Sequence, residues 1–257
     1  MKPYSKEIAQ FYDIIVHGRD HVEAGRKEIQ FIERAFEKFF PGDVKEILDV
    51  GCGNGRFLIP LVREGYTVTG LDFSKDMLSE CDRRLKKQHL QADLLQKDLE
   101  TMDFDSEYDA LLCMDSVICY ILEPEAIIET LKRFRRALRP HGILIIENWN
   151  MLDQWNLLGK THSYTHSSKN TKIQWQERDW YDTFLSIFHI EVTGTVSRVG
   201  ICTPFHHEEV LKVLAITEMG LYLEAAGFAA QFAYPSYHFS KTQQVNSEVM
   251  LFLALSP

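Results

Sequence analysis

The sequence predicts an α/β fold built around a parallel sheet. Two observations predict it. From Lys45 onward, short apolar runs alternate with amphipathic stretches, which is typical of βαβ units. The first apolar run also leads directly into a glycine-rich turn between Gly51 and Gly55. With 257 residues, 45% of them hydrophobic, the chain can bury one large core, so we expect a single domain with additions.

The N-terminal segment is predicted to be helical. Apolar side chains recur at helical spacing over residues 5–40, with an interruption at Gly18. Pro41-Gly42 ends the pattern. Residues 1–42 are therefore expected to form a helical cap.

Residues 43–150 are expected to form the central α/β core. Ser74 is predicted to be the N-cap of one of its helices. The predicted strands are Glu46–Val50, Tyr66–Leu71, Tyr108–Cys113 and Ile143–Glu147, and the predicted helices are Arg56–Glu64, Ser74–Lys87 and Pro124–Leu138.

The amino-acid pattern changes in the last third of the chain. Residues 151–216 mix aromatic and β-branched residues with polar ones, which predicts an antiparallel β insertion. Its clearest strand-like stretches are Thr171–Trp175 and Thr183–Val196. Residues 217–257 are expected to close the fold with a helix over Thr217–Gly227, capped by Thr217 and stopped by Gly227, and a strand over Ser247–Leu255.

Charge and composition exclude several partner classes. Lys and Arg total 28 against 37 Asp and Glu, so the formal net charge is -9 and we expect neither nucleic acid nor an anionic membrane as a partner. The start has no apolar leader segment, and no run of about 18 apolar residues occurs, so we expect a cytoplasmic protein. The five cysteines are irregularly spaced and predict reduced thiols rather than disulfides or a zinc site.

The glycine-rich turn is the most informative stretch. Glycines at this spacing let a ligand lie against main-chain N–H groups at the start of a helix. Asp49 precedes the turn, and Asp72 follows the next strand at 17 residues after Gly55. A carboxylate in the position of Asp72 suits the two hydroxyls of a ribose. A dinucleotide site needs its third glycine where Arg56 stands, so a nicotinamide-dependent oxidoreductase is the lesser alternative.

Six segments in order extend this hypothesis: DVGCGNG, VTGLDFSKDML, QKDLETMDF, YDALLCMDS, LRPHGILIIENW and LEAAGF. Together they resemble class I S-adenosylmethionine-dependent methyltransferases. The resemblance implies a Rossmann-like seven-stranded sheet with an N-terminal helical lid. We expect the antiparallel β insertion to build an acceptor pocket or a homodimer contact. The YSKEIAQFYD start, the ENWN phrase and residues 204–209 are similar to sugar N-methyltransferases that dimethylate nucleotide-linked deoxysugars.

The resemblance also implies roles for individual residues. Gly51, Cys52 and Gly53 would line the methionine portion of S-adenosylmethionine, within a turn bounded by Asp49 and Gly55. Asp72 would hold its ribose. The other implied cofactor contacts are Phe73 and Met77 beside the adenine, Asp98 and Leu99 at its amino group, Met114 and Asp115 under the sulfonium, and Tyr12 closing over it. Met77 and Leu99 could equally be ordinary core residues.

The expected reaction is methyl transfer to a small molecule, with a nucleotide-linked amino sugar as the leading acceptor. An O-methyltransferase acting on a small hydroxylated metabolite, and a cofactor-binding protein without activity, are the alternatives. Methyl transfer needs orientation and an unprotonated acceptor rather than a covalent nucleophile. Besides Tyr12, the candidates for the catalytic site are Asp115, Tyr120, Glu147, His206 and His207. The amino-sugar enzymes carry His where this chain has Tyr120, so its role stays open.

Two further groups of residues have competing interpretations. The pairs His17/His21 and His162/His166 have a spacing that could present two imidazoles to a metal on a helix, but neither belongs to a metal motif, so we expect no metal. The tryptophans could stack on an acceptor or pack the insertion onto the core; they are Trp149, Trp155, Trp175 and Trp180.

Overall fold

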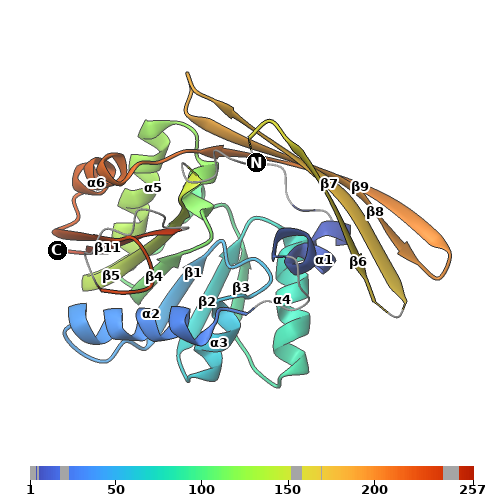
Figure 1. Ribbon diagram of the computed structural model, residues 1–257. Coiled ribbons are helices and arrows are strands. Elements are labelled where there is room, and N and C mark those ends of the chain that lie inside the picture. The colour runs from blue at the N-terminus through green and yellow to red at the C-terminus, as the bar shows by residue number, and fades with distance from the viewer. Residues whose placement is uncertain (1–3, 5, 18–22, 152–157, 169, 240–248) are drawn as a thin grey trace.

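The computed structural model describes residues 4, 6–17, 23–151, 158–168, 170–239 and 249–257. Two β-sheets organise this part of the chain (Figure 1). A seven-stranded sheet lies between layers of helices, and a separate four-stranded sheet extends away from it past the first helix. The α/β fold class and the antiparallel insertion predicted from the sequence are both confirmed.

The seven-stranded sheet has the order β10-β11-β5-β4-β1-β2-β3. Only β11 runs antiparallel to its neighbours β5 and β10. The strands are β1 Glu46–Val50, β2 Thr67–Asp72, β3 Asp93–Gln96, β4 Tyr108–Cys113, β5 Leu138–Trp149, β10 Ala230–Tyr234 and β11 Val249–Leu255. The predictions for β1 and β4 match residue for residue. The edge strands β3 and β10 were not predicted, because neither forms a buried apolar run.

Helices cover both faces of this sheet. On one face, α2 (Arg26–Phe39), α3 (Leu58–Arg63) and α4 (Lys75–Lys87) share an apolar core with β1. On the other face lie α5 (Pro124–Ala137) and α6 (Ile216–Ala225). Of the two predicted N-terminal helices, α1 (Lys6–His17) lies against α4 near the glycine turn, whereas α2 packs on the sheet.

Local signals placed several helix ends correctly. Ser74 caps α4, since its Oγ accepts a hydrogen bond from the Met77 N–H. Gly227 ends the turn after α6 with a φ of +85°, a conformation that glycine adopts without strain. The prediction of Thr217 as the cap of α6 is wrong. The helix begins at Ile216 after Ala215, whose carbonyl accepts from the Met219 N–H.

The start of β5 also differs from expectation. The sequence predicts that helix α5 extends to Leu138 and that a turn separates it from a strand at Ile143. Instead, Leu138 pairs with Tyr108 of β4, so the strand begins there. The chain then bulges through His141, which has a φ of +64°, before Ile143 pairs with Ala110.

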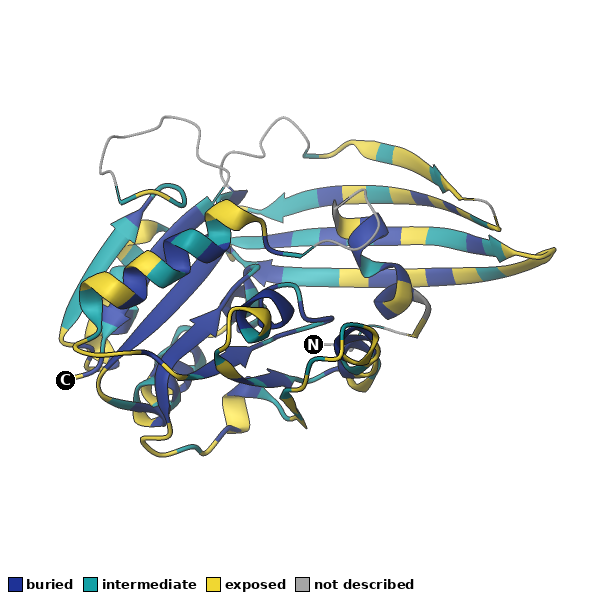
Figure 2. Cartoon of the chain, turned by 90° about the horizontal axis from the view of Figure 1, so that it is seen from below, coloured by how far each residue is buried: buried dark blue, intermediate teal, exposed yellow. Residues whose placement is uncertain are grey.

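The insertion is an antiparallel sheet in the order β6-β7-β8-β9. Its strands are β6 Thr161–Ser167, β7 Thr171–Asp182, β8 Ile187–Arg198 and β9 Ile201–Lys212. Buried and exposed residues alternate along them (Figure 2), because successive side chains point to opposite faces. The buried face shares a core with α1. β6 and β9 were not predicted as separate strands, because many of their residues are polar and the alternation of apolar and polar residues is not visible in the sequence.

Two further observations concern membrane-spanning helices and the cysteines. None of the helices in the described ranges is long and apolar enough to cross a bilayer. All five cysteines are free thiols, as the sequence predicts.

Candidate active site

The carboxyl ends of the parallel strands meet at one edge of the large sheet. β1 runs into Gly51, β2 ends at Asp72, and β4 is followed by Asp115. Ligands of open α/β sheets bind at this edge. A cleft opens here, which we call the glycine cleft, and it gathers ten of the predicted site residues: Tyr12, Gly51, Cys52, Gly53, Asp72, Phe73, Met77, Leu99, Asp115 and Tyr120.

Gly51 shows why the cleft needs a residue without a side chain. It has a φ of +71°, and a Cβ built there would lie 2.6 Å from Val117 Cγ1. The N–H groups of Gly51 and Cys52 both donate to the Leu71 carbonyl, at 2.7 and 3.0 Å. The turn is thereby fixed against the end of β2.

Asp72 anchors the same turn from the other side. Its Oδ2 accepts from the Gly53 N–H at 2.8 Å, and its Oδ1 accepts from the Ser74 N–H at 2.7 Å. Burial raises the pKa of Asp72, while these two N–H groups act in the opposite direction. The carboxylate is therefore held in a fixed orientation at the cleft wall.

Asp49 and Gly55 belong to the turn without lining the cleft. Asp49 lies beneath it at 2% exposure, and its Oδ2 has no hydrogen-bond partner. Burial, together with Asp115 and Asp72, raises its pKa to about 8. Gly55 packs against α4, because a Cβ there would lie 2.8 Å from Cys81 Sγ.

Two other predicted cofactor contacts also lie outside the cleft lining. Met114 is buried in the core beside β1 rather than at the cleft surface. Asp98 caps the short helix η1 (Leu99–Thr101), with its Oδ1 accepting from the Glu100 N–H at 2.9 Å. At that position the cleft wall is formed by Lys97 and Leu99 instead.

The turn after β4 is strained in a way that aims Asp115 into the site. Asp115 and Ser116 have φ values of +51° and +60°, an unusual conformation for non-glycine residues. Arg56 holds the Asp115 carboxylate in this position, since its Nη1 lies 2.9 Å from Asp115 Oδ1 and its Nη2 pairs with Glu28.

Helix α1 is tied down over the cleft by a buried ionic contact. Asn54 Nδ2 donates to Asp13 Oδ1 at 2.8 Å, and Arg84 Nη2 pairs with Asp13 Oδ2 at 2.8 Å. Asp13 thereby connects the glycine turn, α4 and the lid. Tyr12, the residue before Asp13 on α1, lines the cleft.

A second cavity of about 270 Å³ adjoins the glycine cleft. It shares Tyr12, Arg56, Asp115 and Tyr120 with the cleft, so the two spaces have a common wall. We call it the acidic cavity because four carboxylates line it: Glu28, Asp115, Glu147 and Glu209. Trp149, one of the predicted stacking residues, also lines it.

Glu147 is the most deeply buried of these carboxylates. It is 4% exposed, and its Oε2 accepts from the Asp115 N–H at 3.4 Å. Burial and the neighbouring Asp115 raise the pKa of Glu147 to about 8, against the opposing effect of Arg56. This carboxyl therefore titrates close to neutral pH.

A cluster of tyrosines closes the space between the cleft and the insertion. The Tyr4 hydroxyl donates to Glu209 Oε1 at 2.6 Å and lies 2.8 Å from the Tyr120 hydroxyl. Burial raises the pKa of Tyr120 well above its usual value, so its hydroxyl remains protonated. Sequence analysis did not select Tyr4 or Glu209, although both lie in the phrases that carry the resemblance to sugar N-methyltransferases.

The two adjacent histidines of β9 point in opposite directions. His207 is buried, and its ring lies 4.3 Å from the ring of Tyr4. His206 is exposed on the outer face, with its Nε2 3.3 Å from Glu191. Only His207 therefore remains near the site.

The remaining histidine and tryptophan predictions are resolved in part. His162 and His166 lie on β6, so the helical geometry needed for a two-histidine metal site is absent. In the described ranges, no group of three or more potential ligands could hold a metal ion. His21 and Trp155 fall outside the described residues. Trp175 stacks on Tyr164 and Trp180 on His189, both within the insertion.

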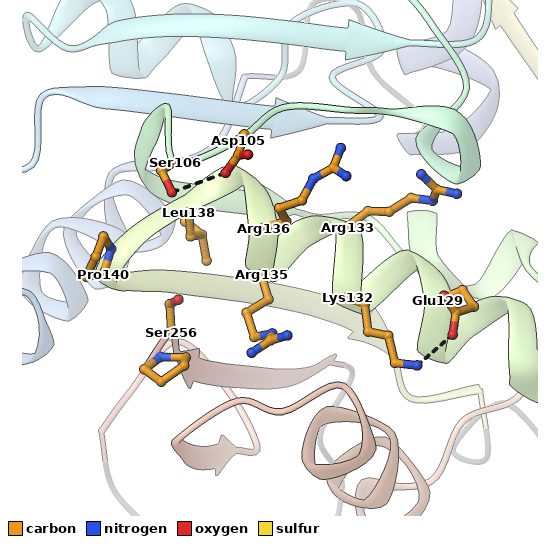
Figure 3. Close-up of a pocket in the computed structure, with 11 residues that line it drawn as sticks. Asp105, Ser106, Glu129, Lys132, Arg133, Arg135, Arg136, Leu138, Pro140 and Ser256 are labelled. Atoms are coloured by element: carbon orange, nitrogen blue, oxygen red, sulfur yellow. Dashed lines mark hydrogen bonds and ion pairs between the residues drawn. The ribbon is translucent and has the colours of Figure 1, made fainter.

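A wide basic depression lies on a different part of the molecule (Figure 3). It is lined by Lys132, Arg133, Arg135 and Arg136 of α5, near the start of β5 rather than at the carboxyl edge. Their side chains diverge instead of converging on one point. Lys132 pairs with Glu129, while Arg133 and Arg136 donate to main-chain carbonyls. We therefore assign no site to it.

Sequence comparison identifies relatives of this chain. Residues 47–142 match the family model described as a methyltransferase domain. The chain is 26% identical over 237 residues to dTDP-3-amino-3,6-dideoxy-alpha-D-glucopyranose N,N-dimethyltransferase of Streptomyces fradiae, covering 89% of this chain and 86% of the relative. It is 31% identical over 129 residues to ubiquinone biosynthesis O-methyltransferase of Rickettsia conorii, covering 50% of this chain and 43% of that protein.

The matches to the first curated relatives span only about half of their length, between 41% and 47%. Among solved structures, the sugar N-methyltransferase KedS8 from Streptoalloteichus sp ATCC 53650 has a TM-score of 0.77 at 20% identity, covering 99% of this chain and 96% of that one. At this identity the likeness shows the fold alone. The resemblance to S-adenosylmethionine-dependent methyltransferases is confirmed.

Proposed function

We propose that this chain, whose residues 47–142 match a methyltransferase domain, is an S-adenosylmethionine-dependent enzyme that methylates an amine of a small molecule. The observation that carries the choice of an amine is the acidic cavity beside the glycine cleft. The choice of cofactor rests on the glycine cleft and on the relatives just described.

The residues of the glycine cleft fit this cofactor. The two glycines leave room for a ligand against the main chain, and a Cβ on Gly53 would lie 3.1 Å from Met77 Cε. Asp72 is fixed at the cleft wall and offers a carboxylate to the ribose. When bound, S-adenosylmethionine supplies a methyl group on a positively charged sulfur.

The acidic cavity suits a cationic acceptor. Four carboxyl groups line it against one cationic side chain in its described lining, Arg56, so negative charge exceeds positive charge even while Glu147 is protonated. An amine is protonated in water at neutral pH, so such a cavity attracts it. An acceptor hydroxyl would gain no comparable attraction.

The acceptor nitrogen must lose a proton before its lone pair can attack the methyl carbon. The carboxylate form of Glu147 is placed to take that proton, because it lines the cavity and its pKa lies near 8. Asp115 is held by Arg56 and orients the acceptor instead. Tyr12 and Tyr120, on the wall between the two spaces, keep water away from the nitrogen.

The insertion contributes to the acceptor site through β9, since Glu209 and Leu211 line the acidic cavity. This supports its predicted role in building an acceptor pocket; a homodimer contact stays a prediction. The relative from Streptomyces fradiae is named for a dTDP-linked amino sugar, and an amino sugar is accordingly our leading acceptor. The name of the Rickettsia relative makes O-methylation the competing outcome.

Calorimetric titration with S-adenosylhomocysteine, followed by a methyl-transfer screen, tests the proposal. Each amine in the screen is paired with the analogue that carries a hydroxyl in its place, and mass spectrometry detects the added methyl. We expect cofactor binding and transfer to amines only. Transfer to hydroxyl analogues alone would replace the amine by a hydroxyl, binding without transfer would indicate a non-catalytic protein, and absence of binding would refute the proposal. Glu147→Gln should lower kcat, with the exposed Glu129→Gln as its control.

A further inference from the structure

Five ionisable side chains lie together on the inner face of the insertion. His162 of β6 pairs with Glu177 of β7. Glu177 pairs in turn with Val192 of β8, and Val192 pairs with His207 of β9, so these residues form one row across the sheet. In the adjacent row, Asp179 of β7 is aligned through Ile190 with Glu209 of β9. We call these residues the polar band: His162, Glu177, Asp179, His207 and Glu209.

The polar band lies on the buried face of its sheet. Alternation along each strand places it beside the apolar side chains of Trp175, Ile190 and Val192, which face the core. Asp179 is 4% exposed and His207 is 8% exposed. A polar group in such surroundings is costly unless a partner satisfies it.

Three atoms of the band lack that partner. Asp179 Oδ1, His162 Nε2 and His207 Nε2 are buried without a hydrogen bond. The last of these lies 3.6 Å from Glu209 Oε1, beyond hydrogen-bonding distance. The orphan atoms belong to three different strands, so no shift of a single strand would pair them all.

The charge of the band indicates what it needs. It contains three carboxyl groups and two imidazoles. Burial, together with Asp179 and Glu209, raises the pKa of Glu177 to about 7. Burial also raises the pKa of Asp179, against the opposing charge of His162. A cation would relieve both effects, and an ammonium group supplies three donors while accepting none.

Glu209 connects the band to the acidic cavity, because it lines that cavity and accepts from Tyr4. Asp179 lies two strands away from Glu209 in the same row, which corresponds to about 10 Å. A second ligand group about 10 Å from one bound at Glu209 would therefore meet Asp179.

We propose that the polar band is a second acceptor subsite that binds an ammonium group, so that the acceptor carries two amino groups, as a diamino sugar or a diamine does. This inference rests on the proposed function for the first amine. It predicts two nitrogens separated by up to about 10 Å, one in the acidic cavity and one at the band. Asp179 and Glu177 are specificity residues in this scheme and take no part in methyl transfer.

Calorimetry on the full chain saturated with S-adenosylhomocysteine tests the subsite. Spermidine is the probe, and butylamine is the matched monoamine. We expect spermidine to bind with one-to-one stoichiometry and at least 10-fold more tightly than butylamine. Asp179→Asn should reduce that preference at least fivefold. Glu208→Gln, on the exposed face of β9, should leave it unchanged and controls for general attraction to a chain of net charge -9.

Equal affinity for the two amines, or equal effects of Asp179→Asn and Glu208→Gln, would overturn the subsite. Glu177→Gln serves as the second variant if Asp179→Asn fails to fold. The readout is binding, so it separates this inference from the proposed function. Methylation of butylamine without a spermidine preference would refute only the subsite, whereas tight spermidine binding without methylation of any amine would refute only the proposed function.

Discussion

The Tyr4 hydroxyl donates a 2.6 Å hydrogen bond to Glu209 Oε1, joining the N-terminal segment to β9 across 205 positions of sequence. The same hydroxyl lies 2.8 Å from that of Tyr120, at the end of the short helix η2 (Val117–Tyr120). Three separate parts of the chain therefore meet at one hydroxyl group. Because this point lies between the glycine cleft and the acidic cavity, it positions Glu209 relative to both spaces.

Tyr4→Phe removes this contact while retaining the aromatic ring. A hydrogen bond to a carboxylate contributes about 1.5–3 kcal/mol, so kcat/KM for the acceptor should fall roughly 10-fold or more. Tyr222→Phe is the matched control, because its hydroxyl donates to Glu218 at 2.7 Å on α6. Steady-state kinetics on both variants check this. An equal loss in the two would show that Tyr4 has no special role.

Asp72 should dominate cofactor affinity. Asp72→Ala removes the group that fixes Gly53 and that would hold the ribose, so the Kd for S-adenosylhomocysteine should rise roughly 10- to 100-fold. Asp98→Ala should change it by less than about threefold, since the Asp98 carboxylate caps η1 rather than lining the cleft. Calorimetric titration compares them, and the reverse ranking would restore Asp98 as the cofactor contact.

Gly51 should tolerate no side chain unless its neighbour makes room. Gly51→Ala places a Cβ against Val117, so we expect a loss of about 2 kcal/mol or more in the free energy of unfolding. Val117→Ala in the same chain should recover part of it. Gly65→Ala, which also has a positive φ but meets nothing within 4 Å, isolates the backbone contribution. Urea denaturation measures all four proteins; no recovery in the double variant would disprove the steric explanation.

Asp49 should make stability depend on pH. Its pKa is about 8 in the folded state against 3.8 for an ordinary Asp, so the folded chain binds the extra proton between these values. Stability contributed by the protonated form is therefore present at low pH and lost as pH rises toward 8. An asparagine side chain does not ionise, so Asp49→Asn does not lose stability in this way. The free energy of unfolding of Asp49→Asn minus that of wild type should therefore increase by about 1 kcal/mol or more from pH 5 to pH 8.

Urea denaturation at the two pH values tests the pH effect, with the exposed Asp93→Asn as the control. A constant difference between Asp49→Asn and wild type would show that Asp49 is ionised in the folded chain.

The sequence was sufficient for the parts of this protein that depend on local pattern. The strand before Gly51, the cap at Ser74 and the strand Tyr108–Cys113 were all predicted, because continuous apolar runs and short capping signals reflect nearby interactions. The glycine spacing and Asp72 located the cleft for the same reason. The strands β3, β6, β9 and β10 were missed where polar or exposed residues obscure the pattern.

Tertiary structure alone decided which chemical groups meet. Glu209 and Tyr4 are unremarkable in isolation, and only the docking of the insertion against the N-terminal segment brings them within 2.6 Å. Strand alternation turned His207 inward and His206 outward, a choice that depends on register. The structure also shows that Asp98 caps η1 and that Met114 is buried in the core. Local sequence specifies the elements, but contacts between distant side chains arise only when those elements pack together.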